Sequence, residues 1–562
     1  MAEIVESDAN KWPNCTQKSI TPSDSITDTS SSNMPNEVAD NANTLDRAAT
    51  RRDSVAEEPA LTRTITSVPG SGDPHFEVDW KAVGEKSNPK SWSAMYRYAA
   101  VMGISYNTMV VVLTSTVYTP TISVVVEEMH STQTITTLGL TTYLFGLAAG
   151  ALITAPLTEV YGRKPVSLIC MCMFAAFIIP CALSESLAML LVFRFLAAFF
   201  GSVMVAASPG MVSDMVTEKN RSLCFSIWGL GPLSGPVIGP IVGGFATQYL
   251  SWRWANWLIC IAAGSALLVS ISMRESYAPI ILQQRAAHLR KITGDRRWWS
   301  RYESKDGLVK TLRDSIKRPI VMAVTEPICI FWNLYVGVLY GILYLSFTAY
   351  PVVFGQIRGW SSSISSLSFL GIGLGTILVI VCEPVIRKLT DSDSKDPKRK
   401  VPPEAVVSAI CVCSILVPIG ELWFAWTCTP ASIHWIVPIL AGVPFGAGNT
   451  GVFIYASSYL TRSYGVFAAS AMVGNCVIRT MLGGITPFVG TFMFSGIGPN
   501  WSATILGLIE VLLIPIPLYF LKHGRKIREK TAMIAQLTAE NERLGAGGGQ
   551  ERQEGQTETA EV

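Results

Sequence analysis

The sequence predicts an all-α membrane protein with twelve transmembrane helices arranged as two six-helix bundles. Three observations predict this fold: many apolar runs are long enough to cross a bilayer, a long basic break divides them six and six, and Lys and Arg gather in alternate breaks. Of the 562 residues, 49% are hydrophobic and only 15% are charged, which is unusual for a soluble chain of this length. The net charge of +3 gives no reason to expect a nucleic-acid partner.

A membrane-spanning helix needs about 20 mainly apolar residues. Twelve segments meet this requirement, and Gly or Pro inside them does not argue against helices, because neighbouring spans can satisfy the freed backbone groups. The predicted spans are 97–118, 135–157, 165–183, 187–212, 222–247, 254–273, 320–348, 362–384, 404–426, 431–458, 464–492 and 500–521.

The basic residues orient these spans. With the N-terminus in the cytoplasm, the breaks after spans 2, 4 and 8 also face the cytoplasm, and each contains Lys or Arg. The opposite breaks near 119–134, 184–186 and 427–430 contain neither, and Arg253 and Arg358 are the exceptions on that side. Because short cytoplasmic loops are enriched in Lys and Arg, we expect both termini to be cytoplasmic.

The composition divides the chain into five predicted regions. Residues 1–94 are rich in Ser, Thr, Asp and Asn and read as a disordered cytoplasmic tail. Residues 95–273 form the first six-helix bundle, 274–318 a basic cytoplasmic loop, 319–522 the second bundle and 523–562 a cytoplasmic tail. A six-plus-six layout is typical of transporters that hold their site between the two bundles.

Several kinds of chemistry lack their sequence signature. There is no GxxxxGK[ST] phosphate loop, no HExxH zinc pattern and no GxSxG elbow. Ten of the 12 cysteines lie inside apolar runs, where they read as packing residues rather than disulfides or ligands. We therefore expect a protein that is not an enzyme, is not driven by ATP, and needs no cofactor and no metal.

The short loop between spans 2 and 3 reads Ala155-Pro-Leu-Thr-Glu-Val-Tyr-Gly-Arg-Lys-Pro165. Gly162 supplies the conformational freedom that a tight turn needs. Glu159 and Arg163 are four residues apart, and Asp214 near the end of span 4 is within plausible reach of Arg163. These residues form either a latch between the bundles, which breaks as the bundles rock, or ordinary positive-inside anchoring.

Span 5 contains a Gly-Pro ladder with a four-residue period. Small residues four apart allow close helix packing, and prolines bend the helix. We expect the ladder to pack on span 8, near Gly371, Gly373 and Gly375, and to act in the conformational change; a packing helix without a special mechanism is the alternative. The ladder consists of Gly231, Pro232, Gly235, Pro236, Gly239 and Pro240, followed by Gly243 and Gly244.

These motifs together resemble the major facilitator superfamily. The 155–165 loop resembles its signature between helices 2 and 3, Arg194 with Gly201-Ser202 resembles its helix 4 motif, and the ladder resembles the antiporter motif of its drug:proton antiporters. Further strings resemble the fungal twelve-span branch that exports drugs, polyamines and toxic metabolites. They are Asn88–Trp92, Trp252–Trp254, Glu326-Pro327, Tyr340–Tyr344 with Tyr350–Phe354, and Tyr464-Gly465 with Asn475 and Arg479.

Ionisable residues inside the spans are few, and each costs roughly 3 kcal/mol at the bilayer centre, so they mark candidate sites. A proton-coupled carrier needs a group that titrates as access alternates, and no histidine lies well inside a span. Glu326, which we place two turns into span 7 beside Pro327, is the first choice, with a structural role as the alternative. Glu421 and Glu510 rank lower because spans 9 and 12 generally lie at the periphery of this fold.

Arg194 in span 4 and Arg479 in span 11 have two interpretations: they contact a polar or anionic substrate, or they form a fixed polar network. Asn475 and Arg479 are four residues apart and therefore share one helix face. Tyr344 belongs to a set of aromatic residues in spans 7 and 10, which would suit amphipathic organic molecules. The predicted proton and substrate residues are thus Glu326, Arg194, Arg479, Asn475 and Tyr344.

The resemblance implies a proton-coupled exporter of a small organic compound, such as a drug, toxin or secondary metabolite, that works by alternating access. Organic-acid or polyamine export is the alternative, and nutrient uptake by the same fold ranks lower because of the ladder. The expected partners are the substrate, protons and the lipid bilayer. We expect a monomer in the plasma membrane.

Overall fold

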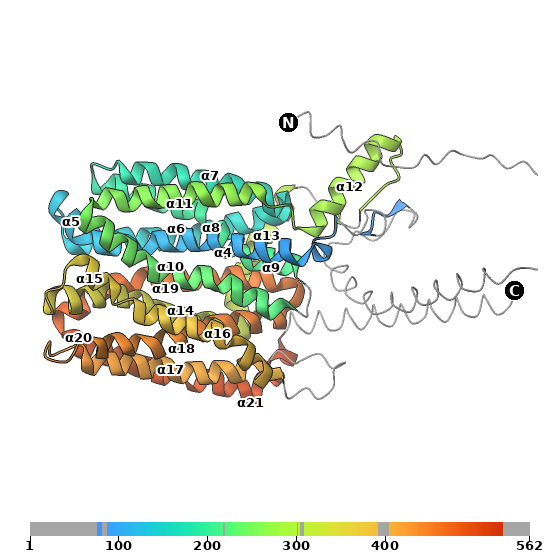
Figure 1. Ribbon diagram of the computed structural model, residues 1–562. Helices are drawn as coiled ribbons and strands as arrows, with labels where there is room; N and C mark the ends of the chain where they lie inside the picture. Colours follow the sequence, from blue (N-terminus) through green and yellow to red (C-terminus); the bar gives the residue numbers. More distant parts are fainter. Residues whose placement is uncertain are drawn as a thin grey trace, which may run out of the picture. The chain divides into compact units, whose positions relative to one another are not determined.

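The computed structural model describes residues 76–80, 87–216, 220–300, 302–303, 308–391 and 404–531. Over these ranges the chain is almost entirely helical, and twelve helices are long and apolar enough to cross a membrane. They run side by side in Figure 1. This confirms the predicted twelve-helix membrane fold. Most of the predicted N-terminal tail 1–94, and residues 532–562 of the C-terminal tail, lie outside the described residues.

The first six spans are built from eight helices, because two spans carry a short helix at one end. They are α4 (Ala94–Thr116) with α5 (Ile122–Glu128), α6 (Gln133–Tyr161), α7 (Arg163–Ala182), α8 (Leu187–Ala206) with α9 (Ser208–Met215), α10 (Arg221–Tyr249) and α11 (Trp252–Ser272). The N-terminal ends of three of these helices follow directly from the sequence. Ser93, Thr132 and Ser186 each accept a hydrogen bond from the backbone N–H three residues later, as N-cap residues do.

The remaining spans follow a separate pair of helices, α12 (Ala278–Thr293) and α13 (Leu308–Thr325). The predicted loop 274–318 thus contains α12 and the first part of α13. The last six spans are α14 (Pro327–Tyr350) with the π-helical turn Pro351–Ile357, α15 (Ser362–Leu367) with α16 (Leu370–Asp391), α17 (Ala405–Thr427), α18 (Ile436–Tyr464), α19 (Ala468–Gly496), and α20 (Pro499–Leu513) with α21 (Pro515–Lys530).

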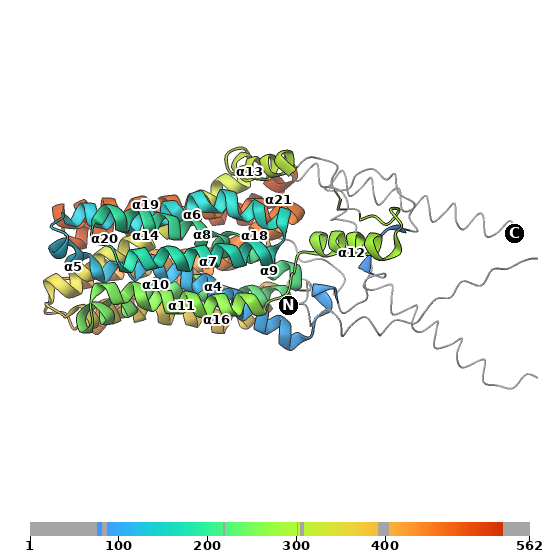
Figure 2. The same ribbon diagram turned by 90° about the horizontal axis from the view of Figure 1, so that it is seen from above.

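We call residues 95–273 the N-terminal half and residues 319–522 the C-terminal half. Within the first, α4 packs on α10 and α6 on α8; within the second, α14 packs on α19 and α17 on α18. Contact between the halves is made mainly by α6 with α19 and by α10 with α15 and α16. Figure 2 shows α6 and α19 close together in the second view. The division into two bundles at 274–318 stays a prediction.

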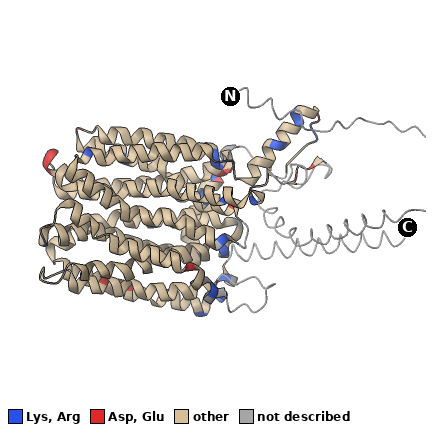
Figure 3. Cartoon of the chain, in the orientation of Figure 1, with Lys and Arg blue, Asp and Glu red and all other residues tan. Residues whose placement is uncertain are grey.

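Charged side chains are concentrated at one end of the helices (Figure 3). We call this the basic end; it is where α7 and α10 begin, with Arg163, Lys164 and Arg221. Arg253 follows the turn after α10 and Arg358 follows the π-helical turn, both at the opposite end. The asymmetry predicted from the sequence therefore corresponds to the two ends of one set of helices.

Four of the ladder's glycines pack against α4, so the prediction that the ladder packs on span 8 is correct only in part. A Cβ added at Gly231 would lie 2.0 Å from the carbonyl oxygen of Ser105, and one at Gly243 would lie 2.2 Å from that of Val117. The glycines expected as partners contact other helices: those at 371 and 375 face the carbonyls of Ile439 and Val443 in α18. Only Gly373 lies against α10, at Val237. Gly244 instead abuts Ser366 of α15.

Proline explains one polar contact of the ladder. Pro232 has no N–H, so the carbonyl of Trp228 four residues earlier loses its helical donor. The Ser105 hydroxyl of α4 donates to this carbonyl at 3.0 Å. In return the Gly231 N–H donates to the Ser105 oxygen at 2.9 Å. The ladder therefore joins α4 and α10 both by close packing and by hydrogen bonds that a proline makes available.

Span 7 starts later than expected. The chain leaves helical geometry at Glu326, and the membrane helix α14 begins at Pro327, the position that proline favours. The preceding residues belong to α13, which packs on α6 and α19. Glu326 is therefore the N-cap residue of α14 and does not lie two turns inside the span, as the sequence had indicated.

The close approach of α4 and α10 yields a test of stability. Gly231→Ala forces α4 away from α10, and overpacking of this kind costs about 1–3 kcal/mol. Gly264→Ala in α11 is the matched control, because a Cβ there meets nothing within 4 Å. We expect a lower thermal unfolding midpoint for the purified full chain with Gly231→Ala and an unchanged or higher one with Gly264→Ala. Equal midpoints would contradict the packing described here.

Candidate functional site: buried polar groups between the two halves

Arg194 is 1% exposed and lies in α8, where the described chain surrounds its charge with dipoles and rings. Its nitrogens donate to the carbonyl oxygens of Gly139 in α6 (2.8 Å) and of Ser115 (3.3 Å) and Thr114 (3.4 Å) in α4. The ring centroids of Tyr118 and Tyr143 lie 4.2 and 5.2 Å from the guanidinium carbon. Because carbonyls and ring faces are both electron-rich, Arg194 holds α4, α6 and α8 together without an ion pair.

Arg479 is also buried, but its surroundings differ. It lies in α19 between the rings of Tyr340 and Phe453, whose centroids are 4.7 and 4.8 Å from the guanidinium carbon. Its only recorded hydrogen bond within the described chain goes to the sulfur of Cys476 at 3.8 Å, and its Nε has no partner there. The rings shield the cation, and much of its donor capacity remains unused.

A pair of amides lies one turn along α19 from Arg479. Asn475 donates from Nδ2 to Oδ1 of Asn333 in α14 at 3.0 Å. Asn333 is fully buried, and its own Nδ2 has no partner in the described chain. Asn475 and Arg479 thus face the same neighbouring helix, α14, as their spacing predicts.

Tyr344 connects the two halves through hydroxyl groups. Its oxygen lies 2.8 Å from the Ser115 hydroxyl of α4 and 3.2 Å from the Tyr340 hydroxyl. Ser115 donates to the Val112 carbonyl at 2.6 Å, so its oxygen is left to accept from Tyr344. Tyr340 in turn donates to Tyr344. The result is a directed chain of hydrogen bonds, Tyr340 to Tyr344 to Ser115. It runs from the ring next to Arg479 to α4, whose carbonyls accept hydrogen bonds from Arg194.

Two further contacts cross between the halves near this chain. Thr141 of α6 donates to the carbonyl of Gly484 in α19 at 2.8 Å. The ring of Trp228 in α10 lies 6.2 Å from that of Phe453 in α18. We call Arg479, Tyr340, Tyr344, Phe453 and Asn333 the central cluster. Single hydroxyls such as Ser115 and Thr141 were not singled out from the sequence, because Ser and Thr are common in membrane helices.

Glu326 is not part of the central cluster. It is 7% exposed at the start of α14, and the Tyr464 hydroxyl at the end of α18 donates to its carboxylate at 3.5 Å. Fourteen residues of helix separate it from Tyr340, which corresponds to about 21 Å. The structure therefore brings Arg479, Asn475 and Tyr344 together and leaves Glu326 near the basic end.

Arg163, at the start of α7, is paired within its own half of the chain. Its Nε donates to Asp214 of α9 at 3.2 Å and its Nη1 to the Thr158 hydroxyl of α6 at 2.7 Å. Its guanidinium also lies 4.9 Å from the ring of Tyr277, a residue whose pKa burial raises above its usual range. The ion pair thus joins α7 to α9 rather than one half to the other.

Glu275, which was not singled out from the sequence, organises the turn at Gly162. Its carboxylate accepts the backbone N–H groups of Arg163 (3.0 Å) and Lys164 (2.9 Å) and so caps α7. Gly162 has φ +104°, and a Cβ there would lie 2.7 Å from the same carboxylate. The sequence signal was a lone acidic residue directly after span 6, beside Arg274.

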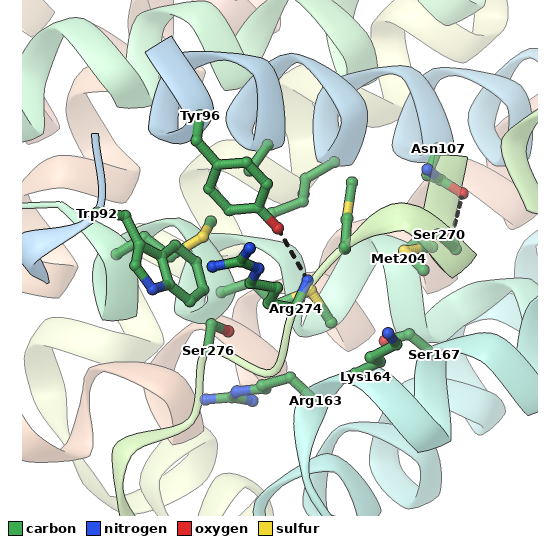
Figure 4. Close-up of a pocket in the computed structure, with 15 residues that line it drawn as sticks. Trp92, Tyr96, Asn107, Arg163, Lys164, Ser167, Met204, Ser270, Arg274 and Ser276 are labelled. Carbon is green, nitrogen blue, oxygen red and sulfur yellow. Dashed lines mark hydrogen bonds between the residues drawn. The ribbon is translucent and has the colours of Figure 1, made fainter. Parts of the chain in front are cut away.

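Two pockets flank this turn. One, of about 480 Å³ including space open to solvent, lies among α4, α7, α9 and the end of α11 and is lined by Trp92, Tyr96, Lys164 and Arg274 among others (Figure 4). The other lies between the halves and is lined by Glu159 of α6, Pro319 of α13, and Ser470 and Val473 of α19. The lining also includes Arg163, so both Glu159 and the arginine of the Arg163–Asp214 pair face the contact between the halves.

No group of three or more His, Cys, Asp or Glu side chains that could hold a metal occurs in the part of the chain that the structure describes. The central cluster offers instead a cation, aromatic faces and amide donors. Such groups bind organic molecules by stacking and hydrogen bonding, and they do not activate water or a nucleophile.

The Tyr344 hydroxyl provides a test of the contact between the halves. Tyr344→Phe removes the acceptor for Tyr340 and the donor to Ser115, which we expect to destabilise the full chain by about 1–2 kcal/mol. Tyr350→Phe is the control, because that ring is stacked on Phe424 and its hydroxyl makes no hydrogen bond in the described chain. Thermal unfolding in detergent measures both. A Tyr344→Phe midpoint equal to that of the control would show that the hydroxyl chain contributes nothing.

Comparison with known proteins agrees with this architecture. The sequence profile of the Major Facilitator Superfamily matches residues 104–479. The chain is 34% identical to the "Major facilitator superfamily multidrug transporter mdrA" of Aspergillus fumigatus, over 86% of this chain and 81% of that protein. It is also 34% identical to the "MFS-type efflux pump MFS2" of Trichophyton rubrum, over 87% of this chain and 83% of that one.

The proton:xylose symporter XylE shares the fold, with a TM-score of 0.55 at 14% sequence identity, over 76% of this chain and 97% of that one. The twelve helices, the matching profile and the relatives agree with one another. The chain therefore belongs to the major facilitator superfamily and is a multi-pass membrane transporter, not an enzyme.

Proposed function

We propose that this protein exports a small organic compound from the cell, in exchange for protons and by alternating access. The observation that carries the proposal is the central cluster, a buried group of polar and aromatic side chains where the two halves meet. Relatives that are named as a multidrug transporter and an efflux pump support the direction of transport.

The walls of the central cluster favour aromatic or amphipathic cargo. The rings of Tyr340, Phe453 and Trp228 are buried at or beside this cluster. Stacking on such faces tolerates many ring systems, because aromatic contacts are worth about 0.5–1.5 kcal/mol each and require only approximate geometry. Broad selectivity for flat organic compounds follows from this chemistry.

The contacts between the halves suit a rocking motion. Among the described residues, the hydrogen bonds between the halves at bilayer depth include Tyr344–Ser115 and Thr141–Gly484, and α6 packs on α19 and α10 on α16 around them. Nearer one end, the Ser363 N–H of α15 donates to Gln248 of α10. Each bond is worth about 1 kcal/mol, so the halves can separate at one end while each half stays rigid.

The cluster around Gly162, Arg163 and Asp214 would act as a latch from within the N-terminal half. It fixes α7 to α9 and holds the end of α6 where Glu159 faces α13 and α19. When the halves rock, Glu159 moves toward or away from α13 and α19, while the Arg163–Asp214 ion pair stays formed. The ladder in α10 would keep α4 and α10 moving as one unit.

Proton coupling requires a carboxylate that changes its exposure. We propose Glu326, because it is a buried carboxylate at the start of α14 that accepts a hydrogen bond from Tyr464. The alternatives are Glu421 of α17 and Glu510 of α20, which are both buried on helices that pack together. Both oxygens of Glu510 lack a hydrogen-bond partner in the described chain.

For the membrane and orientation, we propose the plasma membrane with both chain termini in the cytoplasm. The concentration of Lys and Arg at the basic end supports this orientation. Among the alternative cargoes, polyamines fit poorly beside the buried cation Arg479, whereas organic acids fit well. Organic-acid export is accordingly the second candidate function.

The test uses the purified full chain in proteoliposomes with an acidic interior. Efflux of protons should drive uptake of an anionic aromatic dye such as 8-anilinonaphthalene-1-sulfonate, above the level in protein-free vesicles. Glu326→Gln should reduce pH-driven uptake at least tenfold but leave dye exchange without a gradient. Glu185→Gln, an exposed carboxylate outside the spans, is the control.

Two results would contradict parts of the proposal. Uptake that is equal with and without a pH gradient would rule out proton coupling. Failure of cells that express the protein to lower their content of any compound in a panel of aromatic toxins would contradict export itself.

A further inference from the structure

The two buried arginines at bilayer depth differ in how far the protein satisfies them. Arg194 donates to three carbonyls on two neighbouring helices and lies against two tyrosine rings. Arg479 has two rings but only one recorded hydrogen bond, a 3.8 Å contact with a cysteine sulfur. The protein supplies hydrogen-bond acceptors to Arg194, whereas most donors of Arg479 have no acceptor in the described chain.

The unused groups around Arg479 are donors. Its Nε has no partner, and neither has Nδ2 of the fully buried Asn333, which is bonded through Oδ1 to Asn475. Within the described chain no carboxylate forms an ion pair with Arg479. A site with spare N–H groups and a net positive charge is complementary to a ligand that supplies oxygen acceptors and a negative charge.

Electrostatics makes this arrangement costly unless a ligand completes it. A charge buried in a medium of low dielectric constant is expensive, and ring faces repay only part of the cost. A planar guanidinium pairs best with a carboxylate or a similar oxyanion, through two parallel N–H···O bonds. Arg479 has the nitrogens for such a pair, and the ring centroids of Tyr340 and Phe453 lie 4.7 and 4.8 Å from its guanidinium carbon.

We propose that Arg479 binds a carboxylate or similar oxyanion group of the transported compound, with Asn333 as a second donor and the rings of Tyr340, Phe453 and Trp228 around its aromatic part. The proposal rests on the proposed export function, because it names the class of substrate: aromatic organic acids.

A pocket near the basic end lies on the same helix as this site. The pocket between the halves is lined by Ser470 and Val473 of α19, the helix that carries Arg479. Val473 and Arg479 are six residues apart, or about 9 Å along the helix axis. A compound that enters this pocket would therefore need to advance less than two helical turns to reach the guanidinium.

Three naphthalene compounds of nearly equal size test the proposal on the purified full chain at pH 7.5. They are naphthalene-2-carboxylate, the neutral naphthalene-2-carboxamide and the cationic 2-naphthylmethylamine, with binding measured by calorimetry. We expect the carboxylate to bind at least tenfold more tightly than the carboxamide, which is about 1.4 kcal/mol. Arg479→Gln should remove that difference, and Arg479→Lys should keep part of it, because the charge remains but the fork is lost.

Controls separate loss of the site from loss of the fold. Arg479→Gln should still bind the carboxamide as the unaltered protein does, which shows that the aromatic walls are intact. Arg358→Gln removes another arginine that lies over a ring, 5.8 Å from Phe354 and outside the spans, and should leave the preference for the carboxylate unchanged. Inorganic phosphate and chloride, added in separate titrations, should compete weakly if the site recognises the organic acid as a whole.

Each result decides the proposal. Equal affinity for carboxylate and carboxamide, persistence of the preference in Arg479→Gln, or no measurable binding of the carboxylate would overturn it. So would competition by phosphate or chloride as strong as that of the carboxylate, which would show a site for a free inorganic anion. Because binding needs no transport, an Arg479-dependent preference would stand even if no compound crossed the vesicle membrane, and only the export function would then fail.

Discussion

A polar group at bilayer depth has no water with which to form hydrogen bonds, so its partner must be another group of the protein or a ligand. This requirement accounts for the contacts around which the helices are arranged. Arg194 donates hydrogen bonds to carbonyls of α4 and α6, and Ser105 donates to the carbonyl that lacks a helical donor because of Pro232. Helices that share such a contact are held at one distance and in one register, and the glycine ladder allows the distance to be short.

The same requirement distinguishes contacts within a half from contacts between halves. Within the N-terminal half the arginine network, the ladder and the Glu275 cap connect most helices to one another. Between the halves, the connections at bilayer depth are hydroxyl bonds and ring contacts such as Tyr344–Ser115 and Trp228–Phe453. A cation with unused donors lies beside this weaker boundary, where a bound compound would replace contacts that the halves lose as they move apart.

Hydrophobic patterning predicts the fold because each span must be apolar over its length. The positions of Lys and Arg between the spans predict the asymmetry of charge between the two ends. Arg194, Arg479, Asn475 and Tyr344 were recognisable as rare polar groups in apolar runs, and the last three do lie together. Pairings between helices were not predictable. Most of the ladder packs on α4 and only its last glycine meets span 8, and Glu326 lies at a helix start. Sequence periodicity gives the face of a helix, but not the neighbouring helix or the residue at which α13 ends and α14 begins. Glu275 was missed because its role depends on a backbone turn 112 residues away.

Arg479 carries a charge that the described protein leaves uncompensated. A double-mutant cycle tests it most directly: Asn475→Asp places a carboxylate one turn before Arg479 on the same helix, where the two can pair. Thermal unfolding of the unaltered chain, Asn475→Asp, Arg479→Gln and the double variant gives the coupling free energy between the two positions. We predict that Asn475→Asp is more favourable with Arg479 present than in the Arg479→Gln background, by about 1 kcal/mol or more. A coupling near zero would mean that the protein already compensates the charge of Arg479, and would contradict an incomplete site there.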